Sequence, residues 1–256
     1  MTLDSERCIL CSRCVRFTDE ISKTHELGIF DRGDHSELSI YPGKELNNKY
    51  SGNVVDICPV GALTDRDFRF KCRVWYLESY DSICPGCSQG CNIQIHVNKD
   101  RPHHADGARV MRLKPRYNAE VNQWWMCDAG RYGYKFIDRN RLLAPQKRED
   151  KFAKNMEWDE ILGGLASSLD ALLNRGKETL GILLSPQLAN EDLFVAKQLF
   201  EKNLNFQNIA ILSPTPLGDE DDFLIKADKN PNTRGAAAMG LSKVSPDAIF
   251  QSIEEG

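Results

Sequence analysis

Eight of the nine cysteines fall into two groups of four, and this spacing constrains the fold more than any other feature of the sequence. In each group, three cysteines lie close together and the fourth lies far downstream. The first group is Cys8, Cys11, Cys14 and Cys58, and the second is Cys84, Cys87, Cys91 and Cys127. If each group binds one metal centre, the chain must fold so that the distant cysteine returns to its triplet.

The first group has the spacing expected of a [4Fe–4S] site. Two residues separate each pair within the triplet, so one short loop can present three thiolates to a compact cluster. The bacterial ferredoxin pattern ends in a nearby Cys-Pro, whereas here the Cys-Pro is Cys58-Pro59, 44 residues after Cys14. The alternative is zinc, but structural zinc usually takes two separated Cys-x2–4-Cys pairs. We therefore predict a [4Fe–4S] cluster.

The second group again combines a local triplet with a distant cysteine, 36 residues after Cys91. Gly86 and Gly90 are expected to let backbone amides approach a cluster and point N–H groups at its sulfurs. The alternative is a zinc knuckle, but the neighbouring first group favours a second [4Fe–4S] cluster. The ninth cysteine, Cys72, is expected to be a small buried hydrophobic residue on a strand.

Composition excludes several other classes of function. The chain has 256 residues and a net charge of −4, which gives no case for a nucleic-acid or anionic-membrane surface. Apolar runs such as 180–184 are far too short to span a bilayer, and the N-terminus lacks an apolar signal region. Nine cysteines without an export signal favour metal binding over disulfides.

The sequence contains no recognisable catalytic motif. It lacks Gly-x-Ser-x-Gly, a Walker loop and a dinucleotide fingerprint, and Gly163-Gly164 lies inside a helical pattern. The five histidines lack ligand-like spacing, and we expect His103-His104 to be a solvated loop pair. The carboxylates of residues 219–222 are expected to form a solvated loop. Trp124-Trp125 are expected to shield the cluster beside Cys127, in preference to stacking on a substrate.

Residue periodicity predicts short elements around the cysteines. We expect helices at 15–23 and within 51–57, and strands at 27–30, 37–41, 68–77, 92–97 and 109–113, in a β-rich module that ends near residue 137. A polar linker is expected at 144–152. The elements expected after it are a helix at 157–174, a strand at 179–184, a helix at 191–204 with Leu193, Phe194, Ala196, Leu199 and Phe200 facing inward, and strands at 208–212 and 223–225. Strand–helix–strand in this order implies a right-handed parallel unit.

Several stretches resemble the large iron–sulfur subunit of respiratory NADH:quinone oxidoreductase, complex I. Its cysteine motifs are matched by 7–17 and 51–63, its next module, which molybdopterin oxidoreductases share, by 83–93 and 126–134, and its large α/β domain by 184–194 and 228–235. The resemblance covers nearly the whole chain. It implies an α+β fold with a ferredoxin-like 4Fe-4S segment (1–78), a small β-rich 4Fe-4S module of molybdopterin-oxidoreductase type (79–140) and a partial α/β domain with a parallel sheet (150–256).

The same resemblance implies an oxidoreductase subunit that relays electrons from NADH and flavin toward quinone. By motif, the first four cysteines would hold a main-line cluster and the second four an additional cluster off that line. The implied partners are the flavin/NADH subunit and quinone-side subunits, with no nucleic acid and no membrane insertion. The implied location is cytoplasmic, in the peripheral arm at the cytoplasmic face of the inner membrane. The alternatives are the electron-transfer part of a molybdopterin (formate) dehydrogenase or soluble hydrogenase, and a zinc-stapled interaction module.

Three departures from the family qualify this expectation. The family normally begins with a [2Fe–2S] domain and a His/Cys3-ligated cluster, so we expect that the start is truncated or that another chain supplies the electrons. Molybdenum members often carry Lys or Arg two residues after the last cysteine, where this chain has Ala129, and no molybdenum ligand is visible, so we expect no molybdopterin. The α/β part is far shorter than the molybdopterin-type fold, and we expect a partial copy with a structural role.

Overall fold

The computed structural model describes residues 1–101, 103–149, 152–176 and 180–255. The chain divides into two compact units. Unit 1 comprises residues 1–139 together with 219–226, and unit 2 comprises 140–218 together with 227–256. Both cysteine groups lie in unit 1. No helix among the described residues has the length and apolar character needed to cross a membrane.

The first part of unit 1 is built from short elements. Strand β1 (Thr2–Leu3) pairs antiparallel with β4 (Leu63–Thr64), and β2 (Leu27–Phe30) forms an antiparallel hairpin with β3 (Glu37–Ile40). Helix α1 (Arg13–Arg16) continues as the π-helical turn η2 (Phe17–Ile21), and α2 (Asn53–Ile57) ends at Cys58. Short 3-10 turns lie at η1 (Ser5–Arg7) and η3 (Gly33–His35). These positions confirm the expected helices and strands of this region within a few residues.

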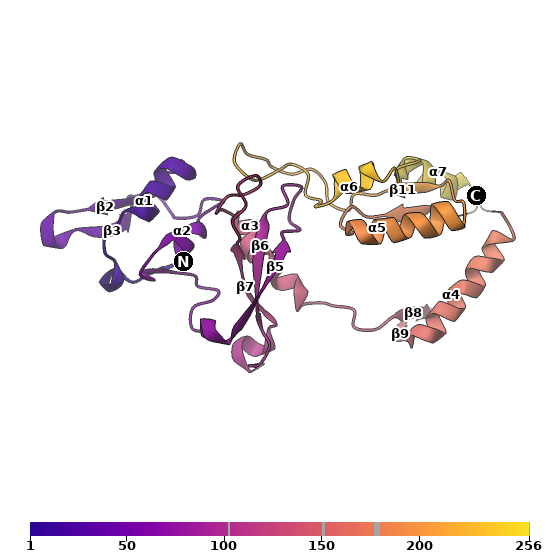
Figure 1. The fold of residues 1–256 in the computed structure, drawn as a ribbon, viewed down its shortest axis with the longest axis horizontal. Coiled ribbons are helices and arrows are strands. Elements are labelled where there is room, and N and C mark those ends of the chain that lie inside the picture. The colour runs from indigo at the N-terminus through magenta and orange to yellow at the C-terminus, as the bar shows by residue number, and fades with distance from the viewer. Residues whose placement is uncertain (102, 150–151, 177–179, 256) are drawn as a thin grey trace. The chain divides into compact units, whose positions relative to one another are not determined.

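The second part of unit 1 is a three-stranded antiparallel sheet in the order β5-β6-β7, shown in Figure 1. Its strands are β5 (Leu77–Ile83), β6 (Asn92–Asn98) and β7 (Val110–Pro115), and helix α3 (Asp128–Tyr132) packs against β7. The 3-10 turns η4 (Val74–Tyr76), η5 (His104–Gly107) and η6 (Gly133–Ile137) complete this part. The strands expected at 92–97 and 109–113 are confirmed as β6 and β7.

An apolar core among the described residues of unit 1 includes cysteines of both groups. Val54, Ile93 and Met126 are almost completely buried in unit 1. The rings of Phe17 and Trp125 lie 5.1 Å apart between their centroids, which joins the segment of the first triplet to the residues before Cys127. Burying such side chains together is the main favourable contribution to folding. The segments of the two groups therefore share one core.

The strand expected at 68–77 is wrong, because the sheet begins only at Leu77. Phe70 has a left-handed backbone (φ 67°) and its side chain is 91% exposed, with the Arg69 guanidinium 4.8 Å from the ring centroid. The alternation of aromatic and basic residues is thus satisfied by a cation–π contact instead of a strand. The observed β5 is largely polar, and none of its seven residues is buried.

Unit 2 contains two parallel strands, β10 (Ile182–Leu184) and β11 (Ile209–Ile211), with Ile182 opposite Ile209. Helix α5 (Asn190–Ala196) and the π-helical η8 (Lys197–Asn203) connect them, and helices α6 (Thr233–Ala238) and α7 (Pro246–Glu255) follow. The expected strand–helix–strand order is present. Of the strand expected at 179–184, Thr179 lies outside the described residues.

Side-chain burial in unit 2 departs from the expected pattern. Leu193 is fully buried with Phe206 and Ile209, but Phe194 is 54% exposed and Leu199 is also exposed, so their predicted inward orientation is wrong. Helix α4 (Trp158–Leu173) confirms the helix expected at 157–174, yet all sixteen of its described residues are at least partly exposed. Its apolar stripe therefore contributes no buried side chain to the core.

Two further expectations about segments are wrong. The region 144–152 is not a linker, since β8 (Gln146–Glu149) pairs antiparallel with β9 (Phe152–Asn155), and residues 150–151 lie outside the description. Backbone pairing forms this hairpin without any apolar alternation. Residues 223–225 form a turn instead of a strand, because the Asp221 carboxylate accepts their N–H groups at 2.9–3.1 Å. Asp221 also accepts from the Tyr50 hydroxyl at 2.6 Å, so it is not part of a solvated loop.

Candidate metal centres

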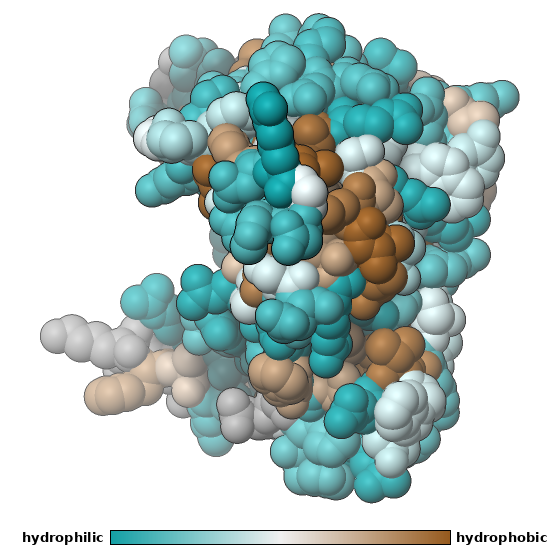
Figure 2. Space-filling model, turned by 90° about the vertical axis from the view of Figure 1, so that its left-hand side faces the viewer, coloured by the Kyte–Doolittle hydropathy of each residue, from teal (hydrophilic) through white to brown (hydrophobic). Residues whose placement is uncertain are grey.

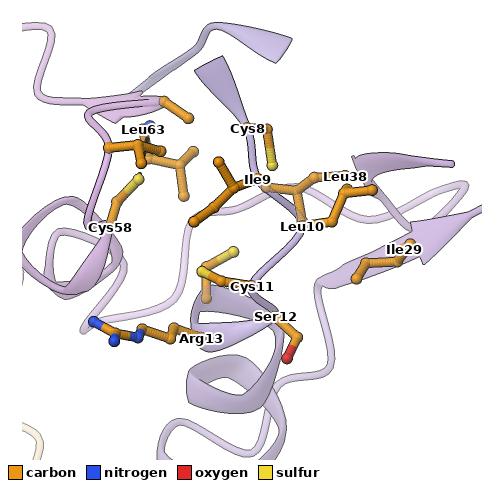
Figure 3. A pocket seen from close by; sticks show the side chains of 13 residues that line it. Cys8, Ile9, Leu10, Cys11, Ser12, Arg13, Ile29, Leu38, Cys58 and Leu63 are labelled. Atoms are coloured by element: carbon orange, nitrogen blue, oxygen red, sulfur yellow. Dashed lines mark hydrogen bonds between the residues drawn. The ribbon is translucent and has the colours of Figure 1, made fainter. Parts of the chain in front are cut away.

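All four cysteines of the first group line one pocket. The triplet approaches it from the loop before and at the start of α1, and Cys58 approaches from the end of α2. Figure 3 shows the sulfurs of Cys8, Cys11 and Cys58 directed toward this common space. Among the described residues, no group of three or more potential ligands is close enough to hold a single metal ion.

The triplet loop owes its shape to unusual backbone conformations. Leu10 and Ser12, which lie on either side of Cys11, both have left-handed backbones, with φ of 53° and 60°. This conformation is costly for a non-glycine residue and is found mainly where surrounding structure or function requires it. It folds the two-residue spacers back so that the three cysteines meet at one pocket, with Cys14 in the first turn of α1.

The distant Cys58 lies among backbone N–H groups. Its Sγ accepts a hydrogen bond from the Leu63 amide at 3.5 Å. Burial tends to raise the pKa of Cys58, but hydrogen bonds from the amides of Leu63, Val60, Ala62 and Gly61 outweigh it, and the pKa is lowered. Amides directed at sulfur stabilise a thiolate, the form that binds iron. The Cys-Pro turn therefore presents a sulfur that is ready to act as a ligand.

Apolar side chains surround this first pocket. Ile9, Leu10, Ile29 and Val60 line it and are all exposed, as is Cys11. Figure 2 is viewed from the left-hand side of Figure 1, where β2 and β3 are drawn, and shows apolar side chains gathered within a largely hydrophilic face. Within the group, Cys14 is buried, and burial raises its pKa to about 11. A thiol in that setting would need a bound cation to ionise near neutral pH.

The second group is held by a hairpin and a helix. Cys84 follows the last residue of β5 and Cys91 precedes the first residue of β6, and the Cys84 amide donates to the Cys91 carbonyl at 2.8 Å. Cys127 is the N-cap of α3, and its Sγ accepts from the Gly130 amide at 3.4 Å. A Cβ atom added to Gly130 would lie 3.0 Å from the Cys84 sulfur and 3.5 Å from the Cys127 sulfur. Both sulfurs therefore flank one glycine.

Burial dominates the electrostatics of this second group. It raises the pKa of Cys91 to about 12, with further contributions from the nearby thiols of Cys84, Cys127 and Cys87. The pKa values of Cys84 and Cys127 are raised for the same leading reason. Each of the four thiols lies close enough to the others for their charges to affect one another's pKa values. If these cysteines bind a metal, its positive charge would be needed to keep such buried thiolates ionised.

The two glycines of the second triplet have different roles. A hydrogen bond from the Gly86 amide lowers the pKa of Cys84 against the larger effect of burial, as expected of an amide directed at sulfur. The Gly90 amide instead donates to the Cys87 carbonyl at 3.4 Å, and Gly90 has a φ of 65°. Gly90 therefore provides the tight turn, since this conformation favours glycine.

Residues outside the two groups differ from expectation. Cys72 is half-buried on no strand, and its sulfur lies 3.5 Å from His104 Nδ1. The prediction of a buried strand residue is therefore wrong, and His104 is more than a solvated loop residue. Trp125 packs against the core, as a shielding residue would, but Trp124 is 62% exposed and stacks on Tyr117. The shielding role thus fails for Trp124.

Sequence reasoning missed a set of polar side chains beside the two distant cysteines. These residues, which we call the α2–α3 junction, are Asn53, Asp56, Asp128 and Arg131. Asp56 lies two residues before Cys58, and Asp128 directly follows Cys127. Their proximity to the predicted ligands is the feature of the sequence that could have pointed to these residues. The local sequence does not specify which of them pair with each other across the fold.

Comparison with known proteins identifies both cysteine segments. Residues 1–64 match the ferredoxin-like domain of NADH-quinone oxidoreductase subunit 3, and residues 77–139 match the molybdopterin oxidoreductase Fe4S4 domain. The NADH-ubiquinone oxidoreductase 75 kDa subunit of Reclinomonas americana is 36% identical over 228 residues, which cover 87% of this chain and 31% of that protein.

Two further relatives agree with this assignment. The mitochondrial NADH-ubiquinone oxidoreductase 78 kDa subunit of Neurospora crassa is 36% identical over 82% of this chain and 27% of its own length, and NADH-quinone oxidoreductase subunit 3 of Thermus thermophilus is 35% identical over 77% and 24%. The chain thus spans less than a third of the length of each of these relatives. By its two matched domains and these relatives, the chain belongs to the family of the large iron–sulfur subunit of NADH-quinone oxidoreductase, whose members are called subunit 3, the 75 kDa subunit or the 78 kDa subunit.

Proposed function

We propose that this chain binds two [4Fe–4S] clusters and relays electrons within an NADH:quinone oxidoreductase, from the NADH and flavin side toward quinone. The observation that carries the proposal is the return of each distant cysteine to its triplet. Cys58 lines the pocket of the first triplet, and Cys127 and Cys84 flank Gly130 in the second group. Three local cysteines and one remote cysteine form the donor set that a cubane cluster requires.

The donor chemistry of both groups fits such clusters. The first would be held by Cys8, Cys11, Cys14 and Cys58, and the second by Cys84, Cys87, Cys91 and Cys127. A bound cluster would supply reversible one-electron transfer. The protein's own contribution is to direct the amides of Leu63, Gly86 and Gly130 at cysteine sulfurs, which favours the reduced, more negative state.

The two groups differ in how they would exchange electrons with other proteins. Cys11 is exposed and apolar residues surround its pocket, so the first cluster would have one accessible corner. Cys84 and Cys91 are buried in the shared core, which would exclude water from the second. This favours the first cluster as the main-line carrier and the second as an additional cluster off that line.

The partners that this proposal implies are the flavin/NADH subunit and the quinone-side subunits, in the peripheral arm at the cytoplasmic face of the inner membrane. We keep the domain boundaries at 1–78, 79–140 and 150–256 as part of the proposal. The last of these, with its parallel pair β10–β11, would be a partial molybdopterin-oxidoreductase-like α/β domain with a structural role. We propose no molybdopterin, because Ala129 lies where molybdenum-containing members often carry Lys or Arg, and no molybdenum ligand is visible in the sequence.

Anaerobic reconstitution with iron and sulfide tests the proposal. The purified chain is expected to be brown, to contain about eight irons, and to show EPR signals after reduction, as two cubanes require. A colourless protein that holds two zinc ions after the same treatment would overturn it. Iron, zinc and acid-labile sulfide should be measured on the same sample, so that partial loading is distinguished from binding of a different metal.

A second candidate is the electron-transfer part of a molybdopterin (formate) dehydrogenase or a soluble hydrogenase. The match of residues 77–139 to a domain of molybdopterin oxidoreductases is the observation that favours it. Stoichiometric molybdenum and pterin in protein purified from its native host would support the dehydrogenase. Copurification with a flavin subunit and quinone-side subunits, without molybdenum, would support the NADH:quinone oxidoreductase.

A further inference from the structure

A buried ion pair joins the two short helices that carry the distant cysteines. Arg131 of α3 is 4% exposed, and its Nη2 donates to Asp56 Oδ2 of α2 at 2.6 Å and to Asn53 Oδ1 at 3.2 Å. Helix α2 ends at Cys58, and α3 begins after Cys127. One guanidinium group thus links the helix of the first site to the helix of the second.

Asn53 makes a second connection, through the backbone before Cys127. Its Nδ2 donates to the Met126 carbonyl at 2.8 Å, and its Oδ1 accepts from the Met126 amide at 3.2 Å. Both residues are almost completely buried. This two-way pairing fixes the chain at the residue that directly precedes Cys127. Because Asn53 is the first residue of α2, it holds that residue against the opposite end of the helix from Cys58.

Asp128 makes the third connection, directly after Cys127. Its carboxylate accepts from the Ser51 hydroxyl at 2.5 Å and from the Gly52 amide at 2.8 Å, and its own amide donates to the Lys49 carbonyl at 2.8 Å. These bonds tie the start of α3 to the loop before α2. Both flanks of Cys127 are therefore bonded to residues 49–53.

The junction is closely packed as well as hydrogen-bonded. A Cβ atom on Gly52 would lie 2.5 Å from Arg131 Cδ and 2.9 Å from Asp128 Oδ1, so the backbone of residue 52 lies directly on these side chains. Lys114 also approaches Asp56, at 3.2 Å. Removal of one partner from a buried ion pair leaves the charge of the other partner uncompensated. A substitution that keeps the charge of the removed partner preserves much of the interaction. The residues of the junction are therefore expected to act as one unit.

We propose that Asp56 and Arg131 are positioning residues that couple the two cluster sites, so that the loading and potential of each cluster depend on a side chain from the other site's segment. The inference rests on the proposed function, since it requires both cysteine groups to bind clusters. Neither side chain is a cysteine ligand. They act by fixing where Cys58 and Cys127 stand and by setting the charge between the two sites.

The charge of Arg131 gives the coupling a measurable direction. A reduced cluster is more negative than an oxidised one, so a nearby cation stabilises the reduced state and raises the midpoint potential. Replacement of Arg131 by methionine removes that cation and leaves Asp56 in place. The midpoint potentials of both clusters should then fall, including that of the first cluster, whose ligands all lie more than 70 residues before Arg131.

The test follows each cluster separately in the chain of 256 residues. Cys127→Ser removes a ligand of the second cluster and leaves the first for measurement, and Cys58→Ser does the reverse. Arg131→Met is introduced into each of these two variants. Arg109→Met is the matched control, because Arg109 forms its ion pair with Asp138 and not with a residue of the junction. Iron per chain and EPR-monitored redox titrations are measured after anaerobic reconstitution.

In the Cys127→Ser background, Arg131→Met is expected to lower the iron content or the midpoint potential of the first cluster. In the Cys58→Ser background, it is expected to lower the iron content or the midpoint potential of the second cluster. Arg109→Met should change neither quantity in either background. A first cluster with unchanged iron content and potential would overturn the coupling. If Arg131→Met fails to fold, as judged by circular dichroism, Asp56→Asn removes the anion of the pair and leaves the Arg131 cation in place. The midpoint potentials of both clusters should then rise, and a rise in one cluster or in neither overturns the coupling.

Measurements on the protein without substitutions distinguish failure of this proposal from failure of the proposed function. If it binds no iron–sulfur cluster, the function itself is overturned, whatever the variants do. If it binds both clusters and Arg131→Met alters only the second, the function stands and the coupling falls. An Asp56→Asn and Arg131→Met pair adds a further check, because their combined effect on iron content should be smaller than the product of the single effects.

Discussion

The two cysteine sites lie in one compact unit, yet they place their sulfurs in different surroundings. The first opens on the surface: Cys11 is exposed, amides that outweigh burial lower the pKa of Cys58, and Cys14 is the buried member, with a pKa raised to about 11. The second is enclosed, and burial raises the pKa values of Cys84, Cys91 and Cys127. Cysteine groups of similar spacing are therefore left open to the surface or enclosed, according to how the chain packs around them.

The largest expected effect comes from removing one distant ligand. Cys58→Ser should abolish the first cluster and leave the second, and Cys127→Ser should do the opposite, because each group needs its fourth thiolate. Iron content should fall by about half in each variant, from two cubanes to one. EPR of the reduced protein identifies the signal that remains. If either single variant lost both EPR signals, the two sites would not load independently of each other.

Trp125 tests whether the shared core supports both sites. Its ring packs 5.1 Å from that of Phe17, whereas Trp124 is mostly exposed. Trp125→Ala should reduce the free energy of unfolding by about 2–3 kcal/mol, and Trp124→Ala by less than about 1 kcal/mol. Denaturant unfolding monitored by circular dichroism measures both. Equal effects of the two substitutions would argue against a core that joins the two sites.

Gly130 tests the enclosure of the second site alone. A Cβ atom there would lie 3.0 Å from the Cys84 sulfur, so Gly130→Ala should lower the occupancy of the second cluster, at a cost of about 1–3 kcal/mol from overpacking. The first cluster should be unaffected. Gly133→Ala is the matched control, because a Cβ atom at that position meets no described atom within 4 Å. Cluster-specific EPR intensity is the measurement.

The smallest effect concerns the pH at which the cysteines of the apoprotein react. Only the thiolate is alkylated, and its fraction grows as pH rises through the pKa of the folded protein. Cys58, whose pKa is lowered, should therefore be labelled by iodoacetamide at lower pH than Cys91, whose pKa is raised to about 12. Mass spectrometry of peptides labelled over a series of pH values measures the order. Labelling of Cys91 before Cys58 would contradict the proposed difference between the sites.

Local sequence predicted the elements nearest the cysteines well. The strands expected at 27–30 and 92–97 and the helix expected within 51–57 are confirmed, because each is specified by alternation or by a turn within a few residues. The strand expected at 68–77 is wrong because that prediction also relied on local alternation alone. Its alternation is genuine, but Phe70 turns outward in a left-handed conformation and the sheet uses the polar run that begins at Leu77.

The sequence by itself determined the number and spacing of the candidate ligands and the family to which they point, because those depend on residue type and on separations along the chain. Only the tertiary structure decided that Cys58 faces the first pocket, that Cys84 and Cys127 flank Gly130, and that Arg131 meets Asp56. Such pairings depend on the packing of segments far apart in the chain, where many weak contacts are summed. No local pattern carries that information.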